Sequence, residues 1–86
     1  MPFLDPQGSQ NWLSQQLSAS GLKTVAKLAE VSGIHKGTLS KYFRQIQRPT
    51  IDVLVVLSQA LQVTPSELLY GLGAIDEPLG PKRGPK

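Results

Sequence analysis

The sequence predicts an all-α domain of five short helices, and three observations lead to this fold class. Apolar residues recur at the i, i+3 and i+4 spacing of a helix face, and no segment shows sustained strand alternation. Capping residues and glycines divide the chain into short helical segments. With 86 residues, the chain forms one domain whose small core must be shared by short elements.

Two helices are expected in the first part of the chain. Residues 1–8 contain two prolines and a glycine, which predict a flexible arm. Ser9 can cap a first helix that ends near Ser20. The apolar stripe of this helix consists of Trp12, Leu13 and Leu17. Thr24 can cap a second helix, and Gly33 can end it in the left-handed conformation.

A third helix is expected from Lys36 to about Arg44, followed by a loop over residues 45–49. Its inward side chains are Leu39, Tyr42 and Phe43. Thr50 can cap a fourth helix that runs to about Leu61. The inward side chains of the fourth helix are Ile51, Leu54, Leu57 and Leu61.

The start of a fifth helix is the clearest signal in the chain. Residues 64–67 are Thr-Pro-Ser-Glu, a capping box with proline at the first helical position, where its missing N–H costs nothing. Gly71 is expected to end this helix. Residues 72–86 contain three glycines and three prolines, which predict a flexible basic tail or linker. The helical domain is therefore expected over residues 9–71.

The basic residues are unevenly placed along the chain. The net charge is +3, but residues 21–50 carry six lysines and arginines against one acid, Glu30. Residues 51–71 carry only two charged residues, Asp52 and Glu67. A basic segment beside a mildly acidic one favours a face that binds a polyanion, although a solvated helix surface would have the same charges.

The composition excludes several classes of function. The chain has no cysteine and one histidine, so no disulfide framework, metal site or cofactor is expected. It has no nucleophile–base pair, carboxylate dyad or phosphate loop, which makes an enzyme the poorest interpretation. No apolar run is long enough for a membrane span, and no secretion signal is present. A cytoplasmic, nucleoid-associated location is therefore expected.

Residues 24–44 contain the strongest indication of function. Two short helices joined by a tight turn cross steeply, which favours a small residue on the first helix and a glycine four residues later. Ala29 and Gly33 meet this requirement. Ile34 and Leu39 supply the apolar side chains needed just after the turn and further along. The combination predicts a helix-turn-helix whose third helix has an exposed face.

At these residues the chain resembles the helix-turn-helix domains of phage repressors and Cro proteins, the xenobiotic-response-element type of bacterial regulator. The resemblance continues in register through Pro49, Thr50 and Leu54 to residues 67–71, and it covers about residues 9–71. It implies a lambda-repressor-like fold and a sequence-specific transcription regulator of bacterial or phage origin, with repression as the expected mode. Its partner would be double-stranded DNA, bound by a homodimer on two half-sites about one helical turn apart.

The resemblance also implies which residues contact DNA. The third helix lies in the major groove, and the positions that face base edges are Lys36, Gly37, Ser40 and Lys41. Phosphate contacts are expected from Lys23, Thr24, Thr38, Arg44, Gln47 and Arg48. Gly37 has no side chain that can contact a base. It either lets the backbone approach DNA closely or is a helix position that merely tolerates glycine.

The sequence departs from the family pattern at three places, which limits how many of the family's DNA contacts can be assigned to this chain. Val25 stands where a glutamine commonly supports the recognition helix and contacts the DNA backbone, so that contact is absent. His35 occupies the usual Ser/Thr cap position and is expected to be a turn residue rather than a ligand or catalyst. Phe43 and Gln45 replace a polar residue and a glycine, so the following loop is free to take a different path.

The fourth helix leaves two alternatives open. Residues 53–57 are Val-Leu-Val-Val-Leu, which is more apolar than one inward face requires. Either Phe3 and Leu4 of the arm pack over this helix, which we favour, or the helix presents a partner surface. A partner surface would fit a second class of function, an antitoxin-like or control-subunit-like protein-interaction module with the same fold. Such a module would bind its partner through the fourth or fifth helix.

Dimerisation of the free chain is expected to be weak. A stable interface buries about 800 Å² per partner, and a small domain that presents one face to DNA has little apolar surface left. The candidate interface residues are Val53, Val56, Leu68, Tyr70 and Leu72. We therefore expect a monomer in dilute solution and a dimer on DNA.

Overall fold

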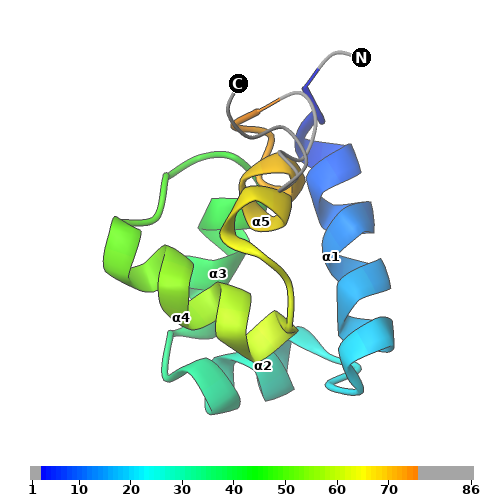
Figure 1. The fold of residues 1–86 in the computed structure, drawn as a ribbon, viewed down its shortest axis with the longest axis vertical. Helices are drawn as coiled ribbons and strands as arrows, with labels where there is room; N and C mark the ends of the chain where they lie inside the picture. Colours follow the sequence, from blue (N-terminus) through cyan, green and yellow to red (C-terminus); the bar gives the residue numbers. More distant parts are fainter. Residues whose placement is uncertain (1–2, 76–86) are drawn as a thin grey trace, which may run out of the picture.

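The computed structural model describes residues 3–75 and confirms the all-α fold (Figure 1). Its helices are α1 (Pro6–Ser20), α2 (Val25–Ser32), α3 (Lys36–Phe43), α4 (Ile51–Leu61) and α5 (Pro65–Gly71). None of these helices is by itself long and apolar enough to cross a membrane, and α4 and α5 meet that criterion only as a pair bent by 98°. Residues 76–86 of the predicted tail and the first two residues of the predicted arm lie outside the described residues.

Side chains cap four of the five helices, which explains where these helices begin. Thr24, Thr50 and Thr64 each accept a hydrogen bond from the amide three residues ahead, as the sequence predicts. The capping box of α5 is complete, because the Glu67 carboxylate accepts a hydrogen bond from the Thr64 amide at 2.9 Å. His35, before α3, makes no side-chain cap bond.

The predicted start of the first helix is wrong. The helix begins at Pro6 and is capped by Asp5, whose Oδ1 accepts a hydrogen bond from the Gly8 amide at 2.7 Å. Proline is compatible with the first turn of a helix, so a residue that indicates an arm by composition here helps the helix to start. Ser9 is not a cap. It is fully buried within α1.

The core is one leucine-rich cluster to which all five helices contribute. Its buried members are Leu13, Leu17, Leu28, Leu39, Tyr42, Phe43, Leu57, Leu61, Leu68 and Leu72. The α1 helix contacts α3, α4 and α5, while α4 packs against α2 and α5. Trp12 stacks on Phe43 with ring centroids 6.3 Å apart and an interplanar angle of 17°. Trp12 is therefore a core residue, as predicted.

The end of α5 differs from the prediction. Gly71 is the last residue of the helix rather than its stop, and it is buried against Trp12. A Cβ at this position would overlap the indole ring, so glycine is required here for space. The left-handed residue is Gly73, with φ 77°. Leu72 was expected to begin the tail, but it is 1% exposed and belongs to the core.

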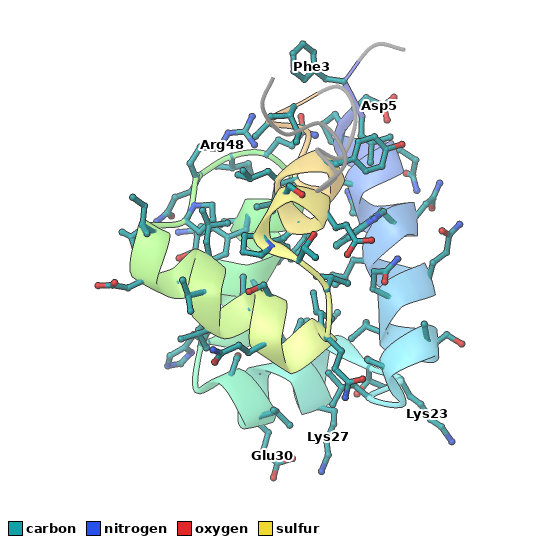
Figure 2. The ribbon with its side chains drawn as sticks, in the orientation of Figure 1. Phe3, Asp5, Lys23, Lys27, Glu30 and Arg48 are labelled. Carbon is teal, nitrogen blue, oxygen red and sulfur yellow. The ribbon has the colours of Figure 1, made fainter. Side chains whose placement is uncertain are left out.

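The outer face of α4 is uncovered, which corrects two predictions. Ile51 was expected to face the core, but it is 77% exposed. It is the first residue of the helix, so its side chain points back beyond the packed turns. Val55 and Val56 are also exposed. Phe3 does not cover them, because it is 57% exposed and lies near the start of α1, well apart from α4 (Figure 2).

Candidate nucleic-acid interface

The α2 and α3 helices and the turn between them form the predicted helix-turn-helix. Gly33 closes α2 with φ 75°, and its amide donates a hydrogen bond to the Ala29 carbonyl at 2.9 Å. A Cβ at Gly33 would meet no atom within 4 Å, so glycine is needed for the backbone conformation and not for space. Ile34 is partly buried and Leu39 is fully buried in the core, as this motif requires.

The α3 helix presents one face to the core and leaves the opposite face free. Leu39, Tyr42 and Phe43 make up the buried side. A helix turns about 100° per residue, which brings the remaining positions of α3 together on the outer side. Of the predicted base-facing residues, Ser40 is partly buried and the others are exposed, namely Lys36, Gly37 and Lys41. One surface of one helix therefore holds all the predicted base-facing positions.

Neither the backbone conformation nor the packing within the described residues requires glycine at position 37. It lies inside α3 without a left-handed φ, and a Cβ there would meet no atom within 4 Å. Glycine within a helix costs about 1 kcal/mol relative to alanine. Glycine therefore makes α3 less stable than alanine would, at one of the positions expected to face the bases.

The predicted phosphate contacts differ in side-chain exposure and in whether they already make hydrogen bonds within the protein. Five of the six are exposed, and of these Lys23, Arg44 and Gln47 make no side-chain hydrogen bond or ion pair within the described residues. Thr24 is exposed, but its hydroxyl oxygen already accepts a hydrogen bond from the Lys27 amide at 3.1 Å, while Thr38 is partly buried. Arg48 Nη1 donates a hydrogen bond to the Leu72 carbonyl at 2.7 Å. Figure 2 shows Arg48 near α5, at the opposite end of the molecule from Lys23.

The basic residues around α3 lack acidic partners within the described chain. The single ion pair in residues 3–75 joins Lys27 Nζ to Glu30 Oε1 at 3.1 Å, on the exposed surface of α2. Glu30 is also the only acid in residues 21–50. The charges left without an ion pair belong to Lys23, Lys36, Lys41, Arg44 and Arg48. Positive potential therefore accumulates along this segment, as a polyanion site requires.

A hollow of about 250 Å³ lies between α1, α2 and α3. Lys36, Ser40 and Arg44 border it, so three predicted DNA contacts meet there. Val25 also lines the hollow. Gln10 and Ser14 contribute polar groups from α1, and sequence reasoning missed both. Their i, i+4 spacing would have placed them on one face of that helix, but α1 carries no basic residue to draw attention to it.

Comparison with known families agrees with this geometry. A protein-family model described as helix-turn-helix matches residues 21–68, which is more than half of the chain. The match contains α2, α3 and α4 and the start of α5. No curated protein and no solved structure gives a significant match. The chain therefore belongs to the helix-turn-helix family of the Cro/C1 type.

Proposed function

We propose that this chain is a transcription regulator that binds double-stranded DNA sequence-specifically and reads the major groove with α3. Membership of the helix-turn-helix family supports DNA binding. The observation that supports the proposal most directly is the outer face of α3, where Lys36 and Lys41 are exposed without acidic partners. Repression is the expected mode, because occupancy of an operator is enough to exclude another DNA-binding protein.

The residues of α3 predict part of the operator. Lysine donates hydrogen bonds to guanine O6 and N7, so Lys36 and Lys41 favour guanine at the positions that they contact. Ser40 can donate to or accept from a base edge. Gly37 lets the helix backbone approach the bases, because no side chain stands between them. The absence of any packing reason for this glycine supports that role.

Phosphate contacts on both sides of α3 would fix its position in the groove. The proposed contacts are Lys23, Thr24, Thr38, Arg44 and Gln47. Gln10 and Ser14 add two neutral polar groups beside Arg44 at the hollow. Arg48 was expected to belong to this set, but we leave it out because its Nη1 donates a hydrogen bond to the Leu72 carbonyl.

We further propose that the chain binds adjacent half-sites as a homodimer that is weak in the absence of DNA. Leu68 and Leu72 are removed from the candidate interface, because they are 0% and 1% exposed. Val53, Val56 and Tyr70 remain candidates, and the exposed Ile51 and Val55 of α4 are added to them. A stable interface needs about 800 Å² per partner, and these few side chains offer less. Two half-sites on one duplex would supply the effective concentration that the interface lacks.

The same uncovered face of α4 supports a second candidate function, a protein-interaction module with this fold. Ile51 at 77% exposure is the specific observation in its favour. A pure protein binder would have no phosphate contacts, so its affinity for DNA would show no steep salt dependence. The salt dependence of DNA binding therefore separates the two functions.

The experiment is a titration of labelled duplex with the full chain, followed by fluorescence anisotropy at several salt concentrations. We expect log K to fall linearly with log salt, and Arg44→Ala to flatten the slope by about 1. Lys27→Ala is the matched control, because Lys27 is already paired with Glu30 and is not among the proposed contacts. A flat salt dependence in the wild type would contradict DNA binding, and equal slopes for the two variants would contradict the proposed docking.

A further inference from the structure

The helix proposed to read DNA ends at an unusual residue. The Ile46 amide donates to the Lys41 carbonyl at 2.9 Å, and the Gln45 amide donates to the Tyr42 carbonyl at 3.1 Å. This pair of bonds defines the Schellman ending of a helix, whose left-handed residue is usually glycine. Here that residue is Gln45, with φ 63°. A side chain with a Cβ is strained in this conformation, where glycine would not be.

The side chain of Gln45 makes two hydrogen bonds that glycine cannot make. Its Nε2 donates to the Leu4 carbonyl at 2.7 Å and to Ser9 Oγ at 2.8 Å. Leu4 immediately precedes the Asp5 cap of α1, and Ser9 is fully buried within that helix. The end of α3 is thereby joined to the start of α1, which lies far away in the sequence.

The residues that follow α5 pack against the side-chain amide of Gln45. A Cβ at Gly73 would overlap both Gln45 Nε2 and the Leu4 carbonyl, so the residue without a side chain makes room for this junction. Further along the loop, Arg48 Nη1 donates to the Leu72 carbonyl at 2.7 Å. The loop between α3 and α4 is therefore held at two points, by Gln45 to the start of α1 and by Arg48 to the end of α5.

We propose that Gln45 and Arg48 are positioning residues for DNA binding, which hold this loop in place before DNA arrives. The inference rests on the proposed function and extends it. Arg44 and Gln47, two of the proposed phosphate contacts, flank Gln45 closely in the sequence. A loop that is already ordered spares the complex the entropic cost of immobilising these side chains. Arg48 acts through its bond to Leu72 and not by contacting a phosphate.

The chain contains a matched control for Gln45. Gln62 caps the end of α4 with φ 60°, and its exposed side chain makes no hydrogen bond within the described residues. Gln45→Gly and Gln62→Gly are the same substitution in the same backbone conformation, so both relieve the strain and only the first removes a tether. We expect Gln45→Gly to weaken DNA binding about tenfold, because the loop must then be ordered on binding. Gln62→Gly leaves the affinity unchanged.

Two further measurements separate positioning from direct contact. The salt slope of Gln45→Gly stays at the wild-type value, because no phosphate contact is removed. Arg48→Gln loses the charge, and its amide N–H lies two bonds nearer the backbone than Arg48 Nη1, so the bond to the Leu72 carbonyl is also lost. We expect it to lose affinity at the wild-type slope. Arg48→Ala loses affinity at an unchanged slope. A fall in slope with Arg48→Gln would show that Arg48 contacts phosphate and would overturn its positioning role.

Hydrogen exchange in the free protein tests the tether itself. The Ile46 and Gln47 amides both donate to the Lys41 carbonyl, at 2.9 and 3.3 Å. We expect these two amides to exchange faster in Gln45→Gly, with core amides unchanged, and to keep wild-type rates in Gln62→Gly. If Gln45→Gly lowers the melting temperature below the assay range, Ser9→Ala replaces it. That variant removes one acceptor without touching the loop, and we expect a loss of about threefold in DNA affinity.

The outcomes distinguish the two levels of the proposal. A wild-type chain that binds no duplex in a salt-dependent way would overturn the proposed function and the positioning role together. A wild-type chain that binds, while Gln45→Gly binds as tightly as Gln62→Gly, would overturn the positioning role alone. Tenfold weaker binding by Gln45→Gly at an unchanged slope would establish it.

Discussion

Replacement of Gly71 by alanine tests how closely α5 packs on the first helix. The added methyl group would overlap the indole of Trp12, which itself stacks on Phe43 of α3. Trp12 therefore cannot move without disturbing the helix proposed to read DNA. Overpacking of this kind costs about 1–3 kcal/mol, which exceeds the small gain in helix propensity. A domain of this size loses about 4–8 °C per kcal/mol, so we expect the melting temperature to fall by roughly 5–20 °C.

Thermal unfolding followed by circular dichroism measures the loss from Gly71→Ala. Trp12 is the only tryptophan, so its fluorescence reports the displaced ring in the same samples. The control is Gly37→Ala, the same substitution in α3, where the new Cβ would meet no atom within 4 Å. This control is expected to gain about 0.5–1 kcal/mol. A Gly71→Ala variant that melts at or above the wild-type temperature would refute the packing of α5 on Trp12.

The remaining predictions concern DNA binding and assembly. Lys36→Ala and Lys41→Ala are expected to relax base preference at particular operator positions, by about 1–3 kcal/mol each, when affinities for single-base operator variants are compared. Arg44→Ala is expected to weaken binding to all duplexes alike, and a base-specific loss would place Arg44 in the groove instead. Gly37→Ala is expected to bind DNA more weakly despite its greater stability, whereas wild-type affinity would mean that this position merely tolerates glycine. The free chain is expected to sediment as a monomer at micromolar concentration, and a tight dimer without DNA would contradict the weak interface.

Helix starts were predictable where the cap is local. Thr24, Thr50 and Thr64 accept from an amide only three residues away, so the sequence pattern contains the whole interaction. At the first helix, Asp5 and Ser9 both have side chains suited to a cap. Asp5 caps the helix, while Ser9 accepts a hydrogen bond from Gln45 and is buried. That choice depends on a contact between distant segments, which a local pattern does not contain.

In the candidate site too, the local features were predictable from the sequence and the contacts between distant segments were not. Helical periodicity and the constraints of the turn predict which residues of α3 share its outer face, and the structure brings Lys36, Gly37 and Lys41 together there. Their contacts with DNA remain predictions. The hollow that Gln10 forms with α3 depends on how α1 packs, and the bond of Arg48 depends on where α5 ends. Both are consequences of tertiary packing between separate helices.

The central claim is that α3 reads base sequence, and selection of binding sites from random duplex DNA by the full chain tests it most directly. We expect one enriched motif that contains guanine and is repeated as two half-sites about one helical turn apart. A selected pool with no sequence enrichment over the starting pool would contradict the claim.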